Sequence, residues 1–366
     1  MQQADRMQAV AVTPGRAGSA RLVEVPQPAA PGPGEALVRV LQAGVCGTDV
    51  EITGGLYGAA PAGDDFLILG HESFGVVEDV GPDVHDLAPG DYVAAMVRHP
   101  DDCPNCRRGE WDMCIKGDYR ERGIRGLHGF MRPYYVERTS HLVLVPAARR
   151  TLGVLMEPLS IVEKGLAQIA RIQDRMHWEP TTAVVLGAGP IGLLATAVFR
   201  VSGYRTFTVA RTPRPNSRAD LVEQMGAVYL STQETPVSEL GRALGQIDVI
   251  LEATGNGAVA FEAVHSLGTN GILCLTSVTP GDRRVEVPAD TVNMRLVLGN
   301  MAVFGAVNAN RSHFEQGVRH LEMFEQLWPG VIARLITHRF PLADFAAALE
   351  QQQDRESIKV VLDLAG

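Results

Sequence analysis

Short apolar runs separated by Pro- and Gly-rich turns occupy the first part of the chain. Runs of this kind, bounded by turn residues, predict β-strands. The predicted strands are residues 8–12, 21–25, 35–41, 73–80, 91–97 and 142–145. From 152 to 175 the apolar positions recur with a helical period instead. This part of the chain is therefore predicted to be β-rich and to end in a helix.

The rest of the chain alternates strand patterns with helix patterns. Strands are predicted at 183–186, 205–210, 248–252 and 271–277, and helices at 217–225 and 258–266. This alternation predicts an α/β fold with a doubly wound parallel sheet. After residue 308 the pattern predicts two helices, 308–325 and 342–353, and a last strand, 358–362. We expect this tail to return to the β-rich domain.

A glycine-rich turn links the strand at 183–186 to the apolar helix that follows it. The turn reads G-x-G-x-x-G and consists of Gly187, Ala188, Gly189, Pro190, Ile191 and Gly192. Between a strand and a helix this motif predicts dinucleotide binding, because the glycines permit a tight turn and a close approach of the pyrophosphate. The alternative is a glycine turn without a ligand. A membrane-spanning helix at 181–199 is not expected, because three glycines and a proline interrupt the apolar run.

Composition narrows the class of protein. The chain has 366 residues, of which 46% are hydrophobic and 20% charged, which suggests a globular protein of two domains. The net charge of −9 argues against a nucleic-acid partner. No apolar segment follows the first residue, so we expect no secretory signal, no membrane partner and a cytoplasmic location. Five cysteines, three of them close together, favour metal binding over a disulfide framework.

Cys46 and His71 are candidate metal ligands at strand–loop junctions. A thiolate and an imidazole are good zinc ligands, and a catalytic zinc takes about three protein ligands and leaves one position open. Taken singly, Cys46 could be a buried apolar side chain and His71 a hydrogen-bonded loop histidine. Together, ahead of a nucleotide-binding fold, the two residues favour a catalytic zinc.

These motifs resemble a known family. Cys-Gly-Thr-Asp at 46–49, Gly-His-Glu at 70–72 and the glycine turn resemble the zinc-dependent medium-chain alcohol dehydrogenases. Within them the segments 121–131, 156–164 and 305–314 are similar to the glucose (aldose) 1-dehydrogenases. The resemblance implies a Rossmann dinucleotide-binding domain at 158–305. It also implies a β-rich GroES-like catalytic domain made of 1–157 and 306–366.

The resemblance also implies roles for individual residues at the zinc. The ligands would come from Cys46, His71, Glu72 and Glu157, with water completing the shell and either carboxylate binding directly. Glu72 and Glu157 would also face the substrate. Asp49 would accept a hydrogen bond from His71 and fix its tautomer.

Further implied residues surround the substrate and the cofactor. Thr48 would contact the reacting hydroxyl and begin the exit of its proton. Glu121 and Asn308 would hold sugar hydroxyls, whereas Thr254 and Val307 would contact the cofactor. Some relatives have an aspartate on the sugar where this chain has Ile161, which weakens the inference that glucose itself is the substrate.

The remaining cysteine cluster consists of Cys103, Cys106 and Cys114. These match the last three ligands of the family's four-cysteine structural zinc lobe, but Pro100 stands at the first position. A neighbouring carboxylate or imidazole could replace the missing thiolate. The candidates are His99, Asp101 and Asp102. Either one of them completes a structural zinc site or the lobe is metal-free.

The residues that follow the second strand of the nucleotide-binding domain indicate whether the cofactor is NAD or NADP. An acidic residue there favours NAD, whereas arginine accommodates the 2′-phosphate of NADP. This chain has no carboxylate at that corner but has Arg211 and Arg214. NADP is therefore predicted as the preferred cofactor, with NAD also used; a solvated basic loop is the alternative.

The function that follows is zinc-dependent hydride transfer from C1 of an aldose to NAD(P), giving the aldonolactone. The alternatives are an alcohol, polyol or modified-sugar (amino-cyclitol) dehydrogenase and a catalytically silent nucleotide-binding protein. The apolar, β-prone stretches 296–298 and 301–304 predict an edge strand that pairs with a second copy, in a homodimer or homotetramer.

Overall fold

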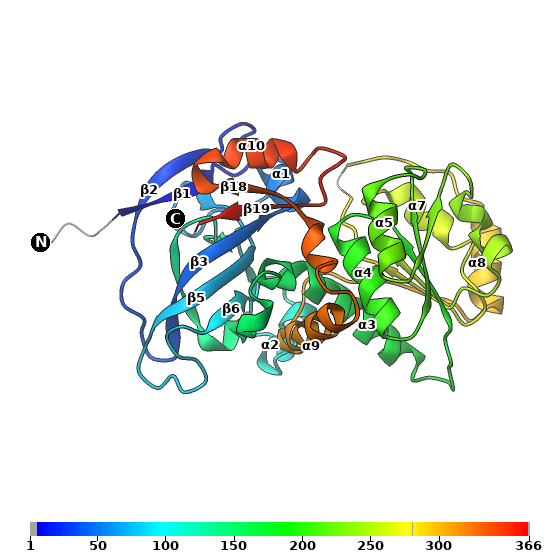
Figure 1. The fold of residues 1–366 in the computed structure, drawn as a ribbon, viewed down its shortest axis with the longest axis horizontal. Helices are drawn as coiled ribbons and strands as arrows, with labels where there is room; N and C mark the ends of the chain where they lie inside the picture. Colours follow the sequence, from blue (N-terminus) through cyan, green and yellow to red (C-terminus); the bar gives the residue numbers. More distant parts are fainter. Residues whose placement is uncertain (1–5, 280, 365–366) are drawn as a thin grey trace, which may run out of the picture. The chain divides into compact units, whose positions relative to one another are not determined.

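The computed structural model describes residues 6–279 and 281–364, which form two compact units (Figure 1). The first unit contains the chain up to Ser160, then Asn308–Leu321 and the segment from Ala333 onward. The second contains Ile161–Val307 and Glu322–Ile332. Most of the tail therefore belongs to the first unit, whereas its middle segment belongs to the second.

The first unit is built on a seven-stranded sheet. Its strand order is β11-β6-β5-β3-β19-β18, and β10 also pairs with β3. The strands are β3 (Glu35–Val45), β5 (Glu72–Val80), β6 (Tyr92–Ala95), β10 (Tyr134–Arg138), β11 (Leu142–Leu144), β18 (Ile336–Pro341) and β19 (Lys359–Asp363). In the part of β3 before Leu41, alternate side chains are buried, as expected of a strand with one face on a core. The red β19 lies beside the blue β3 in Figure 1, so the end of the chain completes a sheet begun near its start.

Smaller elements surround this sheet. Two three-stranded sheets have the orders β2-β1-β4 and β7-β8-β9. Their strands are β1 (Arg6–Val12), β2 (Arg21–Pro26), β4 (Leu67–Ile68), β7 (Arg98–His99), β8 (Arg120–Arg122) and β9 (Gly126–Leu127). The short helices of this unit are α1 (Gly47–Thr53), α2 (Pro104–Arg107) and α10 (Phe345–Gln351). The β-rich character predicted for this part of the chain is confirmed.

The second unit is a parallel sheet with the order β14-β13-β12-β15-β16-β17. Its strands are β12 (Thr182–Leu186), β13 (Arg205–Ala210), β14 (Val228–Ser231), β15 (Val249–Glu252), β16 (Ile272–Leu275) and β17 (Ala302–Gly305). The helices between them are α4 (Pro190–Val201), α5 (Ser217–Gln224), α6 (Leu240–Leu244), α7 (Gly257–Ala263) and α8 (Ala289–Leu298). Because the order reverses direction at β12, the predicted doubly wound sheet is confirmed.

Two long helices complete the chain, α3 (Met156–Gln173) and α9 (Arg311–Leu327). Both were predicted within a few residues, because their apolar positions recur with the helical period. Among the described residues, none of the helices combines the length and hydropathy that a bilayer crossing requires.

One predicted strand segment was wrong. Residues 296–298 form the last turn of α8, and only the following stretch enters a strand, β17. Asn300, with a φ of 47°, lies in the turn between them. Leu298 is 75% exposed, so its apolar character reflects a surface position and not a buried strand.

Candidate active site

Cys46 lies where β3 ends and α1 begins. As the N-cap of α1, its Sγ accepts a hydrogen bond from the Thr48 N–H at 3.3 Å, and Oδ2 of Asp49 accepts one from the Cys46 N–H at 3.0 Å. This reciprocal pair satisfies two N–H groups that the first turn of a helix leaves unpaired. The start of the helix thereby fixes the direction of the thiol, while the half-buried Thr48 remains within reach of solvent.

His71 faces the Cys46 thiol from the loop between β4 and β5. Its Nε2 lies 3.1 Å from Sγ of Cys46, and its Nδ1 lies 3.7 Å from Oδ1 of the fully buried Asp49. The second distance is too long for a hydrogen bond, so the hydrogen bond predicted between His71 and Asp49 is not formed, although the carboxylate lies on the Nδ1 side of the ring. Burial alone would lower the pKa of His71, but the charges of Cys46 and Asp49 outweigh it and hold that pKa well above its usual value. The metal-free cluster therefore retains a proton that a bound cation must displace.

Glu72 completes a group of three potential metal ligands. Its carboxylate and the ligand atoms of Cys46 and His71 all lie within 4.8 Å of one another. The same carboxylate forms an ion pair with the buried ammonium of Lys359, which also donates to the carbonyl oxygen of Val45 at 3.1 Å. Burial lowers the pKa of Lys359, but the charge of Glu72 outweighs this and raises it. Lys359 therefore remains a cation inside the protein.

Glu157, at the start of α3, is a further carboxylate near this group. It is half-buried and is not one of the three clustered ligands. Burial, together with the negative charge of Glu72, raises its pKa to about 7. A metal ion held by the other three residues would offset this effect, because a nearby cation favours the ionised form of a carboxyl group. Glu157 could then approach the metal as a carboxylate.

Gly44 provides the space for the ion pair. A Cβ atom at this position would lie 1.9 Å from Oε2 of Glu72 and 2.9 Å from Cε of Lys359. Neither distance is compatible with normal contacts, so the pair requires glycine at this position of β3.

Glu121 and Asn308, the two predicted sugar-binding residues, form a hydrogen bond in the first unit. Nδ2 of Asn308 donates to Oε1 of Glu121 at 2.9 Å. Arg98 donates to the same oxygen from Nε and Nη2, at 3.0 and 2.9 Å. Asn308 is buried and has a φ of 62°, a conformation that asparagine tolerates better than most residues.

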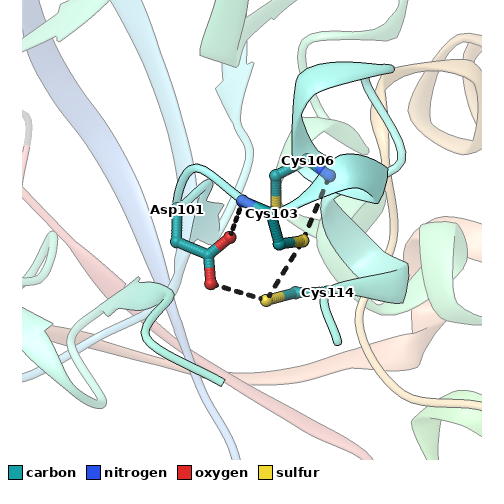
Figure 2. Close-up of side chains that lie close together, drawn as sticks. All are labelled: Asp101, Cys103, Cys106 and Cys114. Carbon is teal, nitrogen blue, oxygen red and sulfur yellow. Dashed lines mark hydrogen bonds between the residues drawn. The ribbon is translucent and has the colours of Figure 1, made fainter. Parts of the chain in front are cut away.

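The cysteine lobe forms a second cluster of potential ligands, which Figure 2 shows with their side chains turned toward one another. Oδ2 of Asp101 accepts from the Cys114 thiol at 2.9 Å, and Sγ of Cys114 lies 3.9 Å from Sγ of Cys103. Together with Cys106, all four offer ligand atoms within 4.8 Å of one another. Burial and the neighbouring Asp101 raise the pKa of Cys106, so this thiol holds its proton until a cation displaces it.

Of the three residues considered as replacements for the missing cysteine, only Asp101 joins this cluster. Asp102 instead forms an ion pair with Lys116 at 3.0 Å. His99 belongs to a separate group with Glu137 and His141.

That third group has the residue types of a metal site but not the geometry. The rings of His99 and His141 stack at 4.2 Å with 8° between their planes. A metal bound in the plane of one ring would therefore lie outside the plane of the other. Nη2 of Arg122 also lies 2.8 Å from Oε2 of Glu137, so a cation already neutralises the carboxylate. We interpret this group as structural.

In the second unit, the glycine turn has the geometry that a dinucleotide requires. Gly187 has a φ of 107°, and a Cβ on it would lie 2.6 Å from the carbonyl oxygen of Ala253. A Cβ on Gly192 would lie 2.0 Å from the carbonyl oxygen of Gly187, whereas one on Gly189 would meet no atom within 4 Å. Gly189 is also the N-cap of α4 and supplies no side-chain cap. Open space at an uncapped helix start fits a phosphate group.

The arginines near the second strand differ in their surroundings. Arg211 is exposed immediately after β13, and its guanidinium makes no hydrogen bond with any described residue. Arg214 is held by Glu223, at 2.9 Å from Nη1, and by the carbonyl oxygen of Tyr229. Arg218, which was not predicted, donates from Nη1 to the carbonyl oxygen of Ala188 at 2.7 Å.

The two remaining cofactor candidates lie in the second unit. The Thr254 N–H donates to Oε1 of Glu252 at 2.6 Å, and the Val307 carbonyl oxygen accepts from Nζ of Lys164 at 2.9 Å. The Val307 side chain is exposed.

Two family descriptions match the chain. "Alcohol dehydrogenase GroES-like domain" matches residues 32–147, and "Glucose dehydrogenase C-terminus" matches residues 150–364. The first match confirms the GroES-like domain predicted for the β-rich part of the chain.

Curated proteins and solved structures agree with these matches. The glucose 1-dehydrogenase of Methanocella arvoryzae is 46% identical over 98% of this chain and 99% of its own. The glucose 1-dehydrogenase of Thermoproteus tenax is 41% identical over 98% of this chain and 99% of its own. Among solved structures, Haloferax mediterranei glucose dehydrogenase in complex with NADP, Zn and gluconolactone is 36% identical, with a TM-score of 0.88 over 98% of this chain and 100% of that one.

Proposed function

We propose that this chain, which belongs to the glucose dehydrogenase family of zinc-dependent medium-chain alcohol dehydrogenases, oxidises C1 of an aldose to the aldonolactone with zinc and NADP. The observation that carries the proposal is the clustering of Cys46, His71 and Glu72 in a chain of which 98% aligns with a glucose 1-dehydrogenase. The complex of the Haloferax relative with NADP, Zn and gluconolactone supports the same reaction.

Zinc fits the donor set at the first cluster. A thiolate, an imidazole and a carboxylate are its usual ligands, and Asp49 behind His71 is a typical orienting carboxylate. We assign Cys46 and His71 as ligands, with Glu72 or Glu157 as the third. When bound there, zinc acts as a Lewis acid that polarises a substrate oxygen and lowers the pKa of a hydroxyl.

The surrounding side chains supply binding and proton transfer. The half-buried Thr48 hydroxyl accepts the proton of the reacting hydroxyl and passes it toward solvent. Glu121 and Asn308 bind other hydroxyls of the sugar and orient the ring. Orientation matters because hydride transfer requires a close approach of the two reacting carbons.

The dinucleotide binds at the glycine turn of the second unit. The N–H groups at the start of α4 receive the pyrophosphate, and the open space at Gly189 admits it. Arg211 binds the 2′-phosphate of NADP, since its guanidinium is exposed at the end of β13. Thr254 and Val307 contact the nicotinamide half. NAD, which lacks this phosphate, binds more weakly.

The cysteine lobe holds a second, structural zinc. Three thiols and the Asp101 carboxylate form a closed set of four ligands, which is typical of structural sites. Asp101 therefore takes the place of the absent cysteine.

The second unit carries the surface for assembly. β17 is one of the two edge strands of the sheet, and Val303 on it is 41% exposed. Leu298 and Val297 of α8 add exposed apolar area nearby in the sequence. Because an open apolar edge favours pairing, we propose that β17 pairs with its counterpart in a second copy, in a homodimer or in the dimers of a homotetramer.

A substrate screen tests the proposed function. Purified protein with bound zinc is assayed with NADP and NAD against aldoses, alditols, amino-cyclitols and simple alcohols. Lactone formation from aldoses with NADP is the expected result. Turnover of alditols or amino-cyclitols alone would replace the aldose assignment, and the absence of turnover with every substrate would contradict an enzymatic role.

A further inference from the structure

Arg98 and Glu121 form a buried ion pair between two very short strands. They lie directly opposite each other in the antiparallel pair β7–β8. Their side chains are 6% and 12% exposed, respectively. A pair this well shielded from water is strong and directional, because solvent neither competes with it nor screens it.

The guanidinium of Arg98 is fixed on more than one side. Nη1 donates to the carbonyl oxygen of Asp112 at 3.3 Å, and Cζ lies 3.7 Å from the centre of the Tyr119 ring. Nε and Nη2 are the groups directed at Glu121. With these contacts in place, Arg98 has little freedom to follow a movement of the carboxylate.

The two oxygens of the Glu121 carboxylate are used unequally. Oε1 accepts three hydrogen bonds, two from Arg98 and one from Asn308. Within the described part of the chain, Oε2 accepts no hydrogen bond from any residue. Three donors on one oxygen fix the rotation of the carboxylate and leave the other oxygen as an acceptor.

We propose that Arg98 is a positioning residue for sugar recognition. It does not touch the sugar but holds Glu121 so that Oε2 accepts a hydrogen bond from one particular hydroxyl of the aldose. This inference rests on the proposed function and assigns its hydroxyl selectivity to a residue outside the zinc site. The competing interpretation is an ion pair that supports only the fold.

The test compares variants with a set of monodeoxy analogues of glucose. Wild type, Arg98→Lys, Arg98→Gln and Glu121→Gln are assayed at saturating NADP with glucose and with each analogue. Arg122→Lys is the matched control, since Arg122 forms a similarly buried ion pair with Glu137 but makes no hydrogen bond to Glu121. NADP affinity, zinc content and melting temperature are measured for every protein.

The expected result is selective. Arg98→Gln raises the KM for glucose about tenfold to a hundredfold, which corresponds to the loss of one charge-assisted hydrogen bond, while kcat and the Kd for NADP change little. For one monodeoxy analogue, the variant and wild type have the same KM, because the hydroxyl read by Glu121 is absent. Arg98→Lys restores part of the selectivity, and Arg122→Lys leaves it as in wild type.

Two results would overturn the inference. An equal loss of kcat/KM for glucose and for every analogue would make Arg98 a structural residue only. If wild type oxidises no aldose, the proposed function fails and this inference falls with it. If the Arg98 variants do not fold, Glu121→Gln takes their place in the test. Its loss of kcat/KM must disappear for the same single monodeoxy analogue, and an equal loss of kcat/KM for glucose and every analogue would contradict the proposal.

Discussion

The carboxylate of Glu72 is paired with the buried ammonium of Lys359, which comes from the last strand of the chain. Glu72 follows His71 directly, so this cation lies beside the proposed zinc ligands. Around it are the acidic groups of Cys46, Asp49 and Glu157. Lys359 thus reduces the negative charge that zinc alone would otherwise have to balance.

Removing the charge of Lys359 should destabilise the protein. We expect Lys359→Met to lower the free energy of unfolding by about 3–5 kcal/mol, because it leaves the buried Glu72 carboxylate unpaired. Urea unfolding of the zinc-loaded protein measures the change. The double variant Lys359→Met with Glu72→Gln should recover most of the loss, and no recovery would mean that the effect comes from packing and not from charge.

Zinc binding should strengthen as pH rises. The raised pKa of His71 means that the metal-free protein holds a proton well above the usual histidine range, and zinc must displace it. We expect the zinc Kd to fall about tenfold per pH unit for each proton released until the pH passes that pKa. Competition with a chelator from pH 6 to 8 measures this dependence.

Two variants separate this effect from other causes. Asp49→Asn removes a charge that raises the pKa of His71, so the rise in affinity should end at a lower pH. Cys46→Ser should lose the catalytic zinc and the activity while keeping its affinity for NADP. Full turnover by Cys46→Ser after removal of adventitious metal would refute the zinc assignment.

Arg211 and Arg214 should differ in their effect on cofactor choice. Arg211→Ala is expected to weaken NADP binding about tenfold or more and to change NAD binding little, because a charge-assisted contact with the phosphate is lost. Arg214→Ala is the matched control, since Glu223 and Tyr229 already hold that guanidinium. Calorimetric titration with NADP and with NAD gives, for each variant, the ratio of its Kd to that of wild type. Equal effects of the two substitutions would remove the basis for assigning the phosphate to Arg211.

Asp101 should determine the zinc content of the cysteine lobe. Elemental analysis is expected to find two zinc ions per wild-type chain and one per Asp101→Ala chain, whereas Asp101→Cys keeps both. Asp102→Ala serves as the control, because Asp102 pairs with Lys116 and not with the thiols. Reactivity of Cys103, Cys106 and Cys114 toward a thiol reagent should rise only in Asp101→Ala. One zinc per wild-type chain would show that the lobe is empty.

The two edges of the second sheet offer a direct test of assembly. Val303 on β17 and Val228 on β14 are each 41% exposed. Val303→Glu should convert the dimer to a monomer at micromolar concentration, because it places like charges across the strand pair. Val228→Glu should leave the assembly intact. Light scattering distinguishes these outcomes, and a monomeric wild type would contradict the proposal.

Local patterns were sufficient for much of the fold. The glycine turn was predicted because its geometry depends on residues close together in the sequence, as where Gly192 packs against the carbonyl of Gly187. The strands around it were predicted because each is a short apolar run bounded by turn residues. The stretch 296–298 was misread because periodicity cannot separate a strand from a short helical turn in three apolar residues. The N-cap role of Cys46 was not predicted, since cysteine is not among the usual capping residues.

Other contacts between distant parts of the chain were not predicted, because neither a local pattern nor the family resemblance indicated them. Lys359 stands in an ordinary apolar strand, and nothing near it in the sequence indicates a partner at Glu72. Arg98 likewise lies in a strand of two residues, too short to show any period. Asp101 was one of three candidates for the cysteine lobe, and only the path of the loop selects it.

The return of the tail to the first unit has a consequence for biosynthesis. Asn308 and Lys359 are translated long after Cys46 and His71, yet they lie in the same unit. A ribosome-bound chain released only as far as Ser160 has neither the cation opposite Glu72 nor the amide opposite Glu121. Metal binding at Cys46 and His71 and sugar recognition should therefore be complete only after synthesis of β19, and nascent chains arrested before that strand should fail to retain the zinc at Cys46 and His71.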